Sequence, residues 1–311
     1  MRNSQERHGD SDGVAALAAR QHGLVTRRQL IGLGLGESAI NYRCQNGRLF
    51  RVHRGVYAVG RWPATPVERA AAAVLACGPG AALSHGSALS VWGFVSGWRE
   101  PYHVTSARLH VRPGIVTHEA RGLTRADIRT QLGIRVTSPA RTFLDCAIEL
   151  GPHRLPRVAA DARRSGHLHV AQIADVLDRF RFHPGRTPLL EALGGLQQPT
   201  RSELEEAFLA FCRRYGLPQP RVNSYPWRFE CDMLFEAERV IVELDGWDFH
   251  RDRYAFEGDR DRDVELAVLG YFPIRITWKR LIEHPEREAR RLHQLLRDRR
   301  ELLAAAARGR A

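Results

Sequence analysis

Three carboxylates stand in or beside apolar stretches in the last third of the chain. Asp232 lies within residues 227–235, where apolar and polar side chains alternate as in a half-buried strand. Glu243 and Asp245 lie at the end of residues 239–244, a run whose β-branched side chains predict a buried strand. Burying a carboxylate is costly unless it is paired or binds a metal. We therefore expect either a divalent cation with oxygen ligands here or ion pairs with arginines of a neighbouring helix.

Glu243 and Asp245 face the same side of an unbroken strand, because side chains alternate along it. Mg²⁺ or Mn²⁺ held by Asp232 and Glu243 would bind a phosphate oxygen and lower the pKa of a bound water, as phosphodiester hydrolysis requires. Asp245 would add a ligand or orient a water. The sequence thus predicts a metal-binding and catalytic set of Asp232, Glu243 and Asp245.

The elements expected around these acids follow the order αβββαβα. Helices are predicted at 203–215 and 252–269 and in the arginine-rich C-terminal segment, and strands at 221–225, 227–235, 239–244 and 272–277. Motifs in the same region are RSELEEAF, GLPQPRVN, ELDGWDFH, FEGDRDRDVEL and LGYFPIRITW. Together they resemble the PD-(D/E)XK nucleases, most closely the very-short-patch-repair-like endonucleases. The resemblance implies a restriction-endonuclease-like core and Mg²⁺-dependent cleavage of phosphodiester bonds.

This resemblance has one departure and adds two residues to the predicted catalytic set. The third catalytic position, a lysine in the PD-(D/E)XK family, is Asp245 here. The very-short-patch-repair branch also lacks that lysine and uses a histidine nearby, a place that His250 fits. His250 would act as general acid or base or contact the leaving group; otherwise it is an ordinary loop histidine. Glu205 is either the acidic residue of the first nuclease helix or the glutamate of a capping box with Ser202.

The composition suits a globular protein of two or three domains, with 311 residues and a net charge of +12. Residues 201–311 hold 21 basic and 21 acidic residues, so the whole excess of positive charge precedes them. The basic cluster at 20–61 indicates either nucleic-acid binding or a solvated arginine-rich surface. Five cysteines without a CxxC pair indicate neither a zinc site nor a disulfide framework. No apolar run reaches the ~18 residues of a membrane span, and no signal-peptide core is present, so we expect a cytoplasmic protein without a membrane partner.

Residues 13–61 predict a winged helix-turn-helix. Short helices are expected at 14–22, 27–33 and 36–46, followed by a basic hairpin at 49–59. The third helix would enter the major groove and the hairpin would lie beside phosphates. The predicted DNA-binding residues are Arg27, Arg28, Ser38, Asn41, Tyr42, Arg43, Arg48, Arg51 and Arg54. The alternative is a winged helix used only for protein contacts, because a fold does not fix a function.

The stretch LVTRRQLIGLGLGESAINYRCQNGRLFRVHRGVYAVG resembles the N-terminal domain of AbiEi-type antitoxins, which are transcriptional autorepressors. The resemblance implies DNA as a partner and a cognate toxin as a second partner. One winged helix reads little sequence and one active site cuts one strand, so we also expect a homodimer.

The middle of the chain is expected to alternate helices with short strands. Helices are predicted at 66–77, 84–92, 139–149 and 155–165. Ser84, His85 and Asp145 do not predict a hydrolase, because Ser84 suits a helix cap and Asp145 an amphipathic helix.

The predicted fold class is α/β with four parts. They are a winged helix-turn-helix (13–61), a middle α/β region (62–183), a hinge (184–200) and an αβββαβ nuclease-like domain (201–298). We expect a DNA-binding protein with a metal-dependent endonuclease domain. The alternative is an antitoxin-like transcriptional regulator whose nuclease fold is catalytically silent, and a third is a protein-interaction module.

Overall fold

The structure is a computed structural model, and it describes residues 12–119, 121–194, 200–245, 262 and 264–308. The chain forms two compact units, Met1–Ala162 and Arg163–Ala311. Both contain helices and sheets, which confirms the α/β class. Among the described helices, none is long and apolar enough to cross a membrane. The finer division at residues 61, 183 and 200 stays a prediction.

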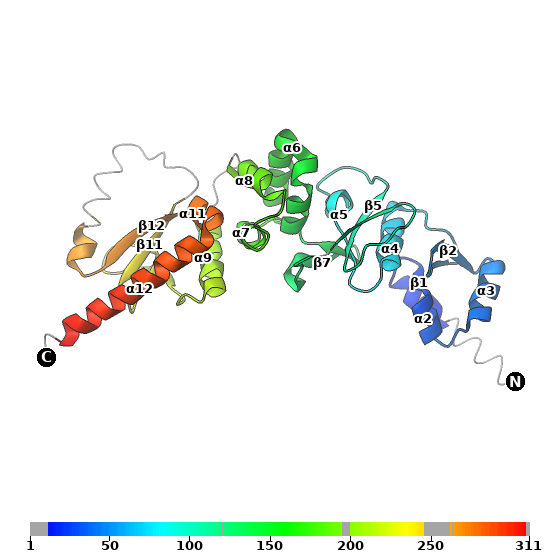
Figure 1. Ribbon diagram of the computed structural model, residues 1–311, viewed down its shortest axis with the longest axis horizontal. Coiled ribbons are helices and arrows are strands. Elements are labelled where there is room, and N and C mark those ends of the chain that lie inside the picture. The colour runs from blue at the N-terminus through cyan, green and yellow to red at the C-terminus, as the bar shows by residue number, and fades with distance from the viewer. Residues whose placement is uncertain (1–11, 120, 195–199, 246–261, 263, 309–311) are drawn as a thin grey trace. The chain divides into compact units, whose positions relative to one another are not determined.

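The first unit begins with a small helical and antiparallel module. After a helix at 12–19 come β1 (Leu24–Thr26), α2 (Arg27–Gly32), α3 (Glu37–Gln45), β2 (Leu49–His53) and β3 (Val56–Val59) (Figure 1). The sheet order is β1-β3-β2, with both pairs antiparallel. The expected helices and hairpin are present, and β1 adds a strand too short for a periodic pattern to indicate.

The start of α2 is fixed by the cap that the sequence predicts. The Thr26 side chain accepts a hydrogen bond from the Gln29 backbone N–H, and the Gln29 side chain accepts one from the Thr26 N–H. Such reciprocal bonds satisfy backbone donors that the first helical turn leaves open. Leu30 and Ile40 then pack into a core with Tyr57 of the sheet, which turns the rest of α3 toward solvent.

The remainder of the first unit is a five-stranded sheet with helices. Its elements are α4 (Pro66–Ala76), β4 (Ala82–Leu83), α5 (His85–Trp92), β5 (Tyr102–Ser106), β6 (Ile115–Glu119), the 3-10 turn η1 (Arg125–Asp127), β7 (Ile128–Gln131), β8 (Ile134–Thr137) and α6 (Pro139–Arg164). The strand order is β6-β5-β4-β8-β7, with β5 and β6 parallel. In α6 the two predicted helices are joined across a kink at Gly151, whose φ of 67° is left-handed.

One apolar core connects the two parts of this unit. The buried alanines Ala70–Ala73 of α4 cluster with Leu24 and Val56 of the N-terminal module at residues 12–59, called the winged module below. They also cluster with Val104 of the five-stranded sheet. Alanine side chains are short, so they allow α4 to lie close to both sheets. On this side, the winged module and the five-stranded sheet therefore share one apolar core.

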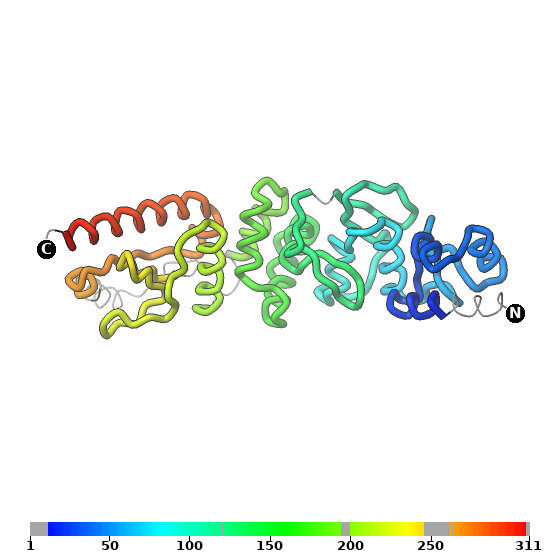
Figure 2. Tube along the Cα trace, turned by 90° about the horizontal axis from the view of Figure 1, so that it is seen from below, coloured from blue at the N-terminus to red at the C-terminus, as the bar shows by residue number. Residues whose placement is uncertain are grey.

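The second unit consists of a mixed four-stranded sheet and several helices. They are α7 (Val170–Arg179), α8 (Arg186–Gly194), α9 (Arg201–Tyr215), β9 (Arg221–Ser224), β10 (Cys231–Phe235), β11 (Val240–Asp245), a helix at 264–268, β12 (Phe272–Thr277), α11 (Trp278–Glu283) and α12 (Pro285–Arg308). The strand order is β12-β11-β10-β9, with only β11 and β12 parallel among these pairs. Figures 1 and 2 both show α12 running along this sheet. The stretch predicted as a hinge, 184–200, contains α8.

The structure bears on two predictions for this unit, a strand at 227–235 and a helix at 252–269. The first half of the strand predicted at 227–235 is wrong: β10 begins at Cys231, and Trp227 has a φ of 64°, which no extended strand allows. The helix predicted at 252–269 is described at 264–268, where it is helical, while residues 246–261 and 263 lie outside the described part of the chain.

Aromatic and aliphatic contacts hold the helices to this sheet. Phe208 of α9 meets Phe235 of β10 edge to face, with ring centroids 6.4 Å apart. Leu266 packs with Leu234 and Ile241. Neighbouring residues of a strand point to opposite faces, so α9 and the 264–268 helix cover opposite faces of the sheet.

Phe208→Ala should lower the free energy of unfolding by about 3–5 kcal/mol, because Phe208 is fully buried and its loss leaves a cavity. Phe182→Ala, at a fully exposed side chain of the same unit, should change it by less than about 0.5 kcal/mol. Urea denaturation followed by circular dichroism measures both. Equal stabilities of the two variants would contradict the packing of α9 on the sheet.

Candidate functional site

The winged module exposes polar side chains along α3. Ile40 is buried, whereas Ser38 and Asn41 are exposed and Tyr42 keeps 62% of its surface accessible. Arg43 is half-buried. A helix with one buried face and an exposed polar face has the form that major-groove recognition requires.

Basic side chains flank this helix. Arg48 precedes β2, Arg51 lies in β2 and Arg54 lies in the turn to β3, and all three are exposed. Helix α3 contacts β2, so these arginines belong to the element beside the exposed helix (Figure 1). In α2, Arg28 is exposed, while Arg27 forms an ion pair with Glu37 of α3.

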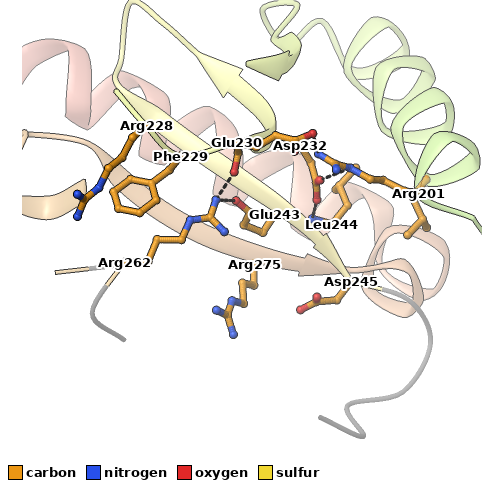
Figure 3. Close-up of a pocket in the computed structure, with 11 residues that line it drawn as sticks. Arg201, Arg228, Phe229, Glu230, Asp232, Glu243, Leu244, Asp245, Arg262 and Arg275 are labelled. Atoms are coloured by element: carbon orange, nitrogen blue, oxygen red, sulfur yellow. Dashed lines mark hydrogen bonds and ion pairs between the residues drawn. The ribbon is translucent and has the colours of Figure 1, made fainter. Parts of the chain in front are cut away.

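A second site is a cavity of about 580 Å³ in the other unit, rich in charge of both signs (Figure 3). Its acidic residues are Glu230, Asp232, Glu243 and Asp245, and its basic residues are Arg201, Arg228, Arg262 and Arg275. The β10–β11 register pairs Met233 with Val242, so Asp232 and Glu243 are the next residues facing each other across the strands. The structure thus brings the predicted acids to one cavity.

Asp232 is 8% exposed and has a partner for each carboxylate oxygen. Its Oδ1 lies 2.8 Å from Nε of Arg201, and its Oδ2 accepts a hydrogen bond of 2.8 Å from the Leu244 backbone N–H (Figure 3). Arg201 also pairs with Glu205 at 3.2 Å and with Glu230 at 2.9 Å. One guanidinium at the start of α9 therefore binds three carboxylates.

Glu243 and Asp245 are held differently. Glu243 pairs with Arg262 at 2.6 Å. Burial raises the pKa of Glu243 and the charge of Asp232 adds to this, while Arg262 opposes both. Asp245, at the end of β11, has its Oδ2 buried without a hydrogen-bond partner among the described residues. A hydrogen-bond donor or a cation in the cavity would satisfy this oxygen.

Glu205 is not part of a capping box, and that expectation is wrong. Helix α9 begins at Arg201 rather than Glu203, so the box forms two residues earlier, between Thr200 and Glu203. Glu205 instead pairs with Arg201, and its Oε2 accepts a hydrogen bond of 3.3 Å from the Asn223 side chain. Its side chain therefore adjoins the charged cavity. His250 lies outside the described residues.

Arginine pairing, one of the two expectations for the acids, is present at Asp232 and Glu243. Among the described residues, the ligand atoms of His85, His103 and His118 lie within 4.8 Å of one another, and no three acidic residues do so. Sequence reasoning missed Arg201 as a cavity residue. Its position four residues before Glu205 on one helix face was the available signal.

Comparison with known proteins adds a finding on the N-terminal part. Residues 14–60 match a family described as a transcriptional regulator, the AbiEi antitoxin, so this part is similar to a regulator domain of that type. The match does not extend to the second unit. No curated protein matches the chain. Among solved structures, the crystal structure of the RV2827C protein from Mycobacterium tuberculosis is similar, with 15% identity over 65% of this chain and 75% of that chain and a TM-score of 0.30.

Arg201→Gln should lower the free energy of unfolding by about 1–3 kcal/mol, because it leaves Asp232 buried without its charged partner. The effect should stay below that of a fully buried pair, since the Arg201 side chain is 49% exposed. Arg221→Gln is the matched control: its pair with Glu236 is exposed on both sides and should contribute no more than about 1 kcal/mol. Urea denaturation compares the two, and equal losses would contradict the role of Arg201.

Proposed function

We propose that the chain is a DNA-binding transcriptional regulator of antitoxin type. The observation that carries this is the exposed polar face of α3 beside the exposed wing arginines. The match of residues 14–60 to the AbiEi antitoxin regulator supports it independently.

In this function α3 lies in the major groove. Asn41 has an amide that can pair with an adenine edge, and Ser38 and Tyr42 supply further polar or apolar contacts to bases. Arg48, Arg51 and Arg54 neutralise phosphates and fix the register without reading sequence. Arg27 contributes less, because Glu37 already engages its charge.

The partners follow from this function. A single α3 contacts few base pairs, so a specific operator needs two copies of the chain, and we propose a homodimer on DNA. A regulator of antitoxin type also implies a cognate toxin protein as a partner. We place the protein in the cytoplasm, where its DNA target lies.

Asn41→Ala and Tyr42→Ala should weaken binding to the DNA upstream of the chain's own coding sequence by about tenfold, with little effect on a random duplex of equal length. Arg51→Ala should weaken binding to both duplexes and reduce the slope of log affinity against log salt by about one. Fluorescence anisotropy with the full chain measures these affinities.

The control for these variants is Arg157→Ala, at an exposed arginine of α6 outside the winged module. It should bind both duplexes as the wild type does. The proposal is overturned if the wild type binds the upstream and random duplexes equally, or if Asn41→Ala and Tyr42→Ala leave the difference between them unchanged.

A second proposed function, metal-dependent DNA cleavage, concerns the charged cavity. The specific observation in its favour is the buried Asp245 Oδ2, which has no partner among the described residues, beside Asp232 and Glu243 on adjoining strands. The order of α9, β9, β10, β11, the 264–268 helix and β12 also agrees with the αβββαβ order expected of the nuclease-like domain.

Mg²⁺ or Mn²⁺ would be held by Asp232, Glu243 and Asp245 and would supply a Lewis acid and a more acidic water for hydrolysis. Oxygen donors of this kind suit either ion. Arg201 pairs with Asp232 and Arg262 pairs with Glu243, and these pairs determine where the two carboxylates lie. Arg275, which also lines the cavity, adds positive charge for a phosphate. Glu205 orients Arg201, and His250 stays a proposed general acid or base.

The wild type should nick supercoiled plasmid with Mg²⁺ or Mn²⁺, and Asp232→Asn and Glu243→Gln should each reduce the rate at least about tenfold. Glu236→Gln, an exposed carboxylate outside the cavity, is the control and should cleave as the wild type does. Gel analysis of nicked plasmid gives the rates. A wild type that binds the plasmid without cutting it would show a silent nuclease fold and leave the regulator as the sole function.

A further inference from the structure

Three histidines from separate elements meet in the first unit, in elements that contribute to neither site described above. His85 opens α5, His103 lies in β5 and His118 lies in β6. One ligand nitrogen of each ring lies within 4.8 Å of those of the other two. All three side chains are half-buried. Imidazole nitrogens at such spacing are the donor set of zinc and related transition metals.

The spacing of the ring nitrogens suits a single ion. His103 Nδ1 and His118 Nε2 are 3.0 Å apart. Two nitrogens bound tetrahedrally to zinc at their usual bond length are separated by about 3.3 Å, so a small movement accommodates an ion. The His85 and His118 rings are stacked, with centroids 3.6 Å apart and an interplanar angle of 16°. An imidazole binds a metal in its own ring plane, so these two rings tilt apart when they share an ion.

A metal ion can take the place of the hydrogen between His103 and His118. In a hydrogen bond between two neutral imidazoles, one nitrogen carries the hydrogen and the other accepts it with its lone pair. A metal ion uses both lone pairs instead.

Hydrogen bonds position two of the three histidines. His85 Nδ1 lies 3.1 Å from the Ser84 hydroxyl, a contact of the kind that orients a metal-binding imidazole. The His103 backbone N–H donates to Ser87 Oγ at 2.8 Å, and its carbonyl accepts from the Ser84 N–H at 3.0 Å, so β5 is attached to the start of α5.

The backbone at His85 is itself unusual. Its φ is 49°, in the left-handed region that a residue with a Cβ adopts at a cost of about 1 kcal/mol. Ser84 occupies the cap position of α5 but makes no capping hydrogen bond with its side chain, which instead contacts the His85 ring. The Ser84 side chain thus contacts the His85 ring instead of capping α5.

The surroundings are favourable to a positive ion. Two acidic residues of α6 act on the cluster through their charge, Asp145 on His118 and Glu149 on His103. His103 and Glu149 also line a cavity of about 230 Å³, which gives the cluster access to solvent. Three protein ligands beside an accessible cavity leave a coordination position for water, as in open zinc sites.

We propose that His85, His103 and His118 bind one divalent transition-metal ion of the zinc class. The ion joins α5 to the β5–β6 pair. Nitrogen donors distinguish this site from the carboxylate cavity, which suits Mg²⁺ or Mn²⁺. The sequence expectation that the cysteines form no zinc site is untouched, because the ligands here are histidines.

The test is metal binding by the full chain after chelator treatment. Zn²⁺ is added and the bound metal is measured by mass spectrometry after gel filtration, and Co²⁺ is titrated while its visible absorption is recorded. The wild type should bind one Zn²⁺ per chain, and its melting temperature should rise by about 5 °C at saturating Zn²⁺. His103→Gln and His118→Gln should each weaken Zn²⁺ binding at least about tenfold.

Two controls keep the result specific. His153→Gln, at an exposed histidine of α6, and Glu236→Gln, at an exposed carboxylate outside both proposed metal sites, should bind Zn²⁺ as the wild type does. Circular dichroism of the metal-free variants establishes that they fold, and His85→Gln replaces any that does not. The proposal is overturned if the wild type binds less than about a tenth of an equivalent, or if folded His103→Gln and His118→Gln retain full affinity.

Discussion

The burial of Asp232 depends on the guanidinium of Arg201. A carboxylate that is 8% exposed, on an inner strand of a four-stranded sheet, needs a charged partner. Helix α9 provides it from its first residue, so the Thr200–Glu203 cap does more than start a helix. It determines where Arg201 lies, and through Arg201 it draws Glu205 and Glu230 to the same place.

The same interaction limits what the cavity can do. A guanidinium and a divalent cation compete for the same carboxylate oxygens, and in the structure the arginines hold Asp232 and Glu243. A metal must therefore replace part of an existing charge network rather than fill an uncompensated cluster of acids. Among the described ion pairs, Arg27 with Glu37 is the one that involves an arginine predicted to bind DNA. The match of residues 14–60 to a transcriptional regulator makes the regulator the better supported function.

Periodicity and capping rules reached much of the fold. The strand at 272–277 was predicted with the bounds that β12 has, and the Thr26 cap of α2 is present. Periodicity did not predict elements of only a few residues, because β1 and β4 are too short to show alternation. It also did not predict the left-handed φ of Trp227, which excludes that residue from a strand. The candidate sites followed the same division. Asp232 and Glu243 share a cavity because they face each other across the paired strands β10 and β11. His85, His103 and His118 carry no motif, and the parallel pairing of β5 with β6 brings the last two together beside the start of α5.

The alanine helix α4 has a bearing on how such a chain can evolve. A module that is exchanged between proteins must keep its own apolar interior when it is separated from its neighbours. Here Leu24 and Val56 share their interior with Ala70–Ala73 and the five-stranded sheet. Recombination at residue 61 would leave apolar surface on both fragments, so descent should preserve the first 162 residues as one heritable block.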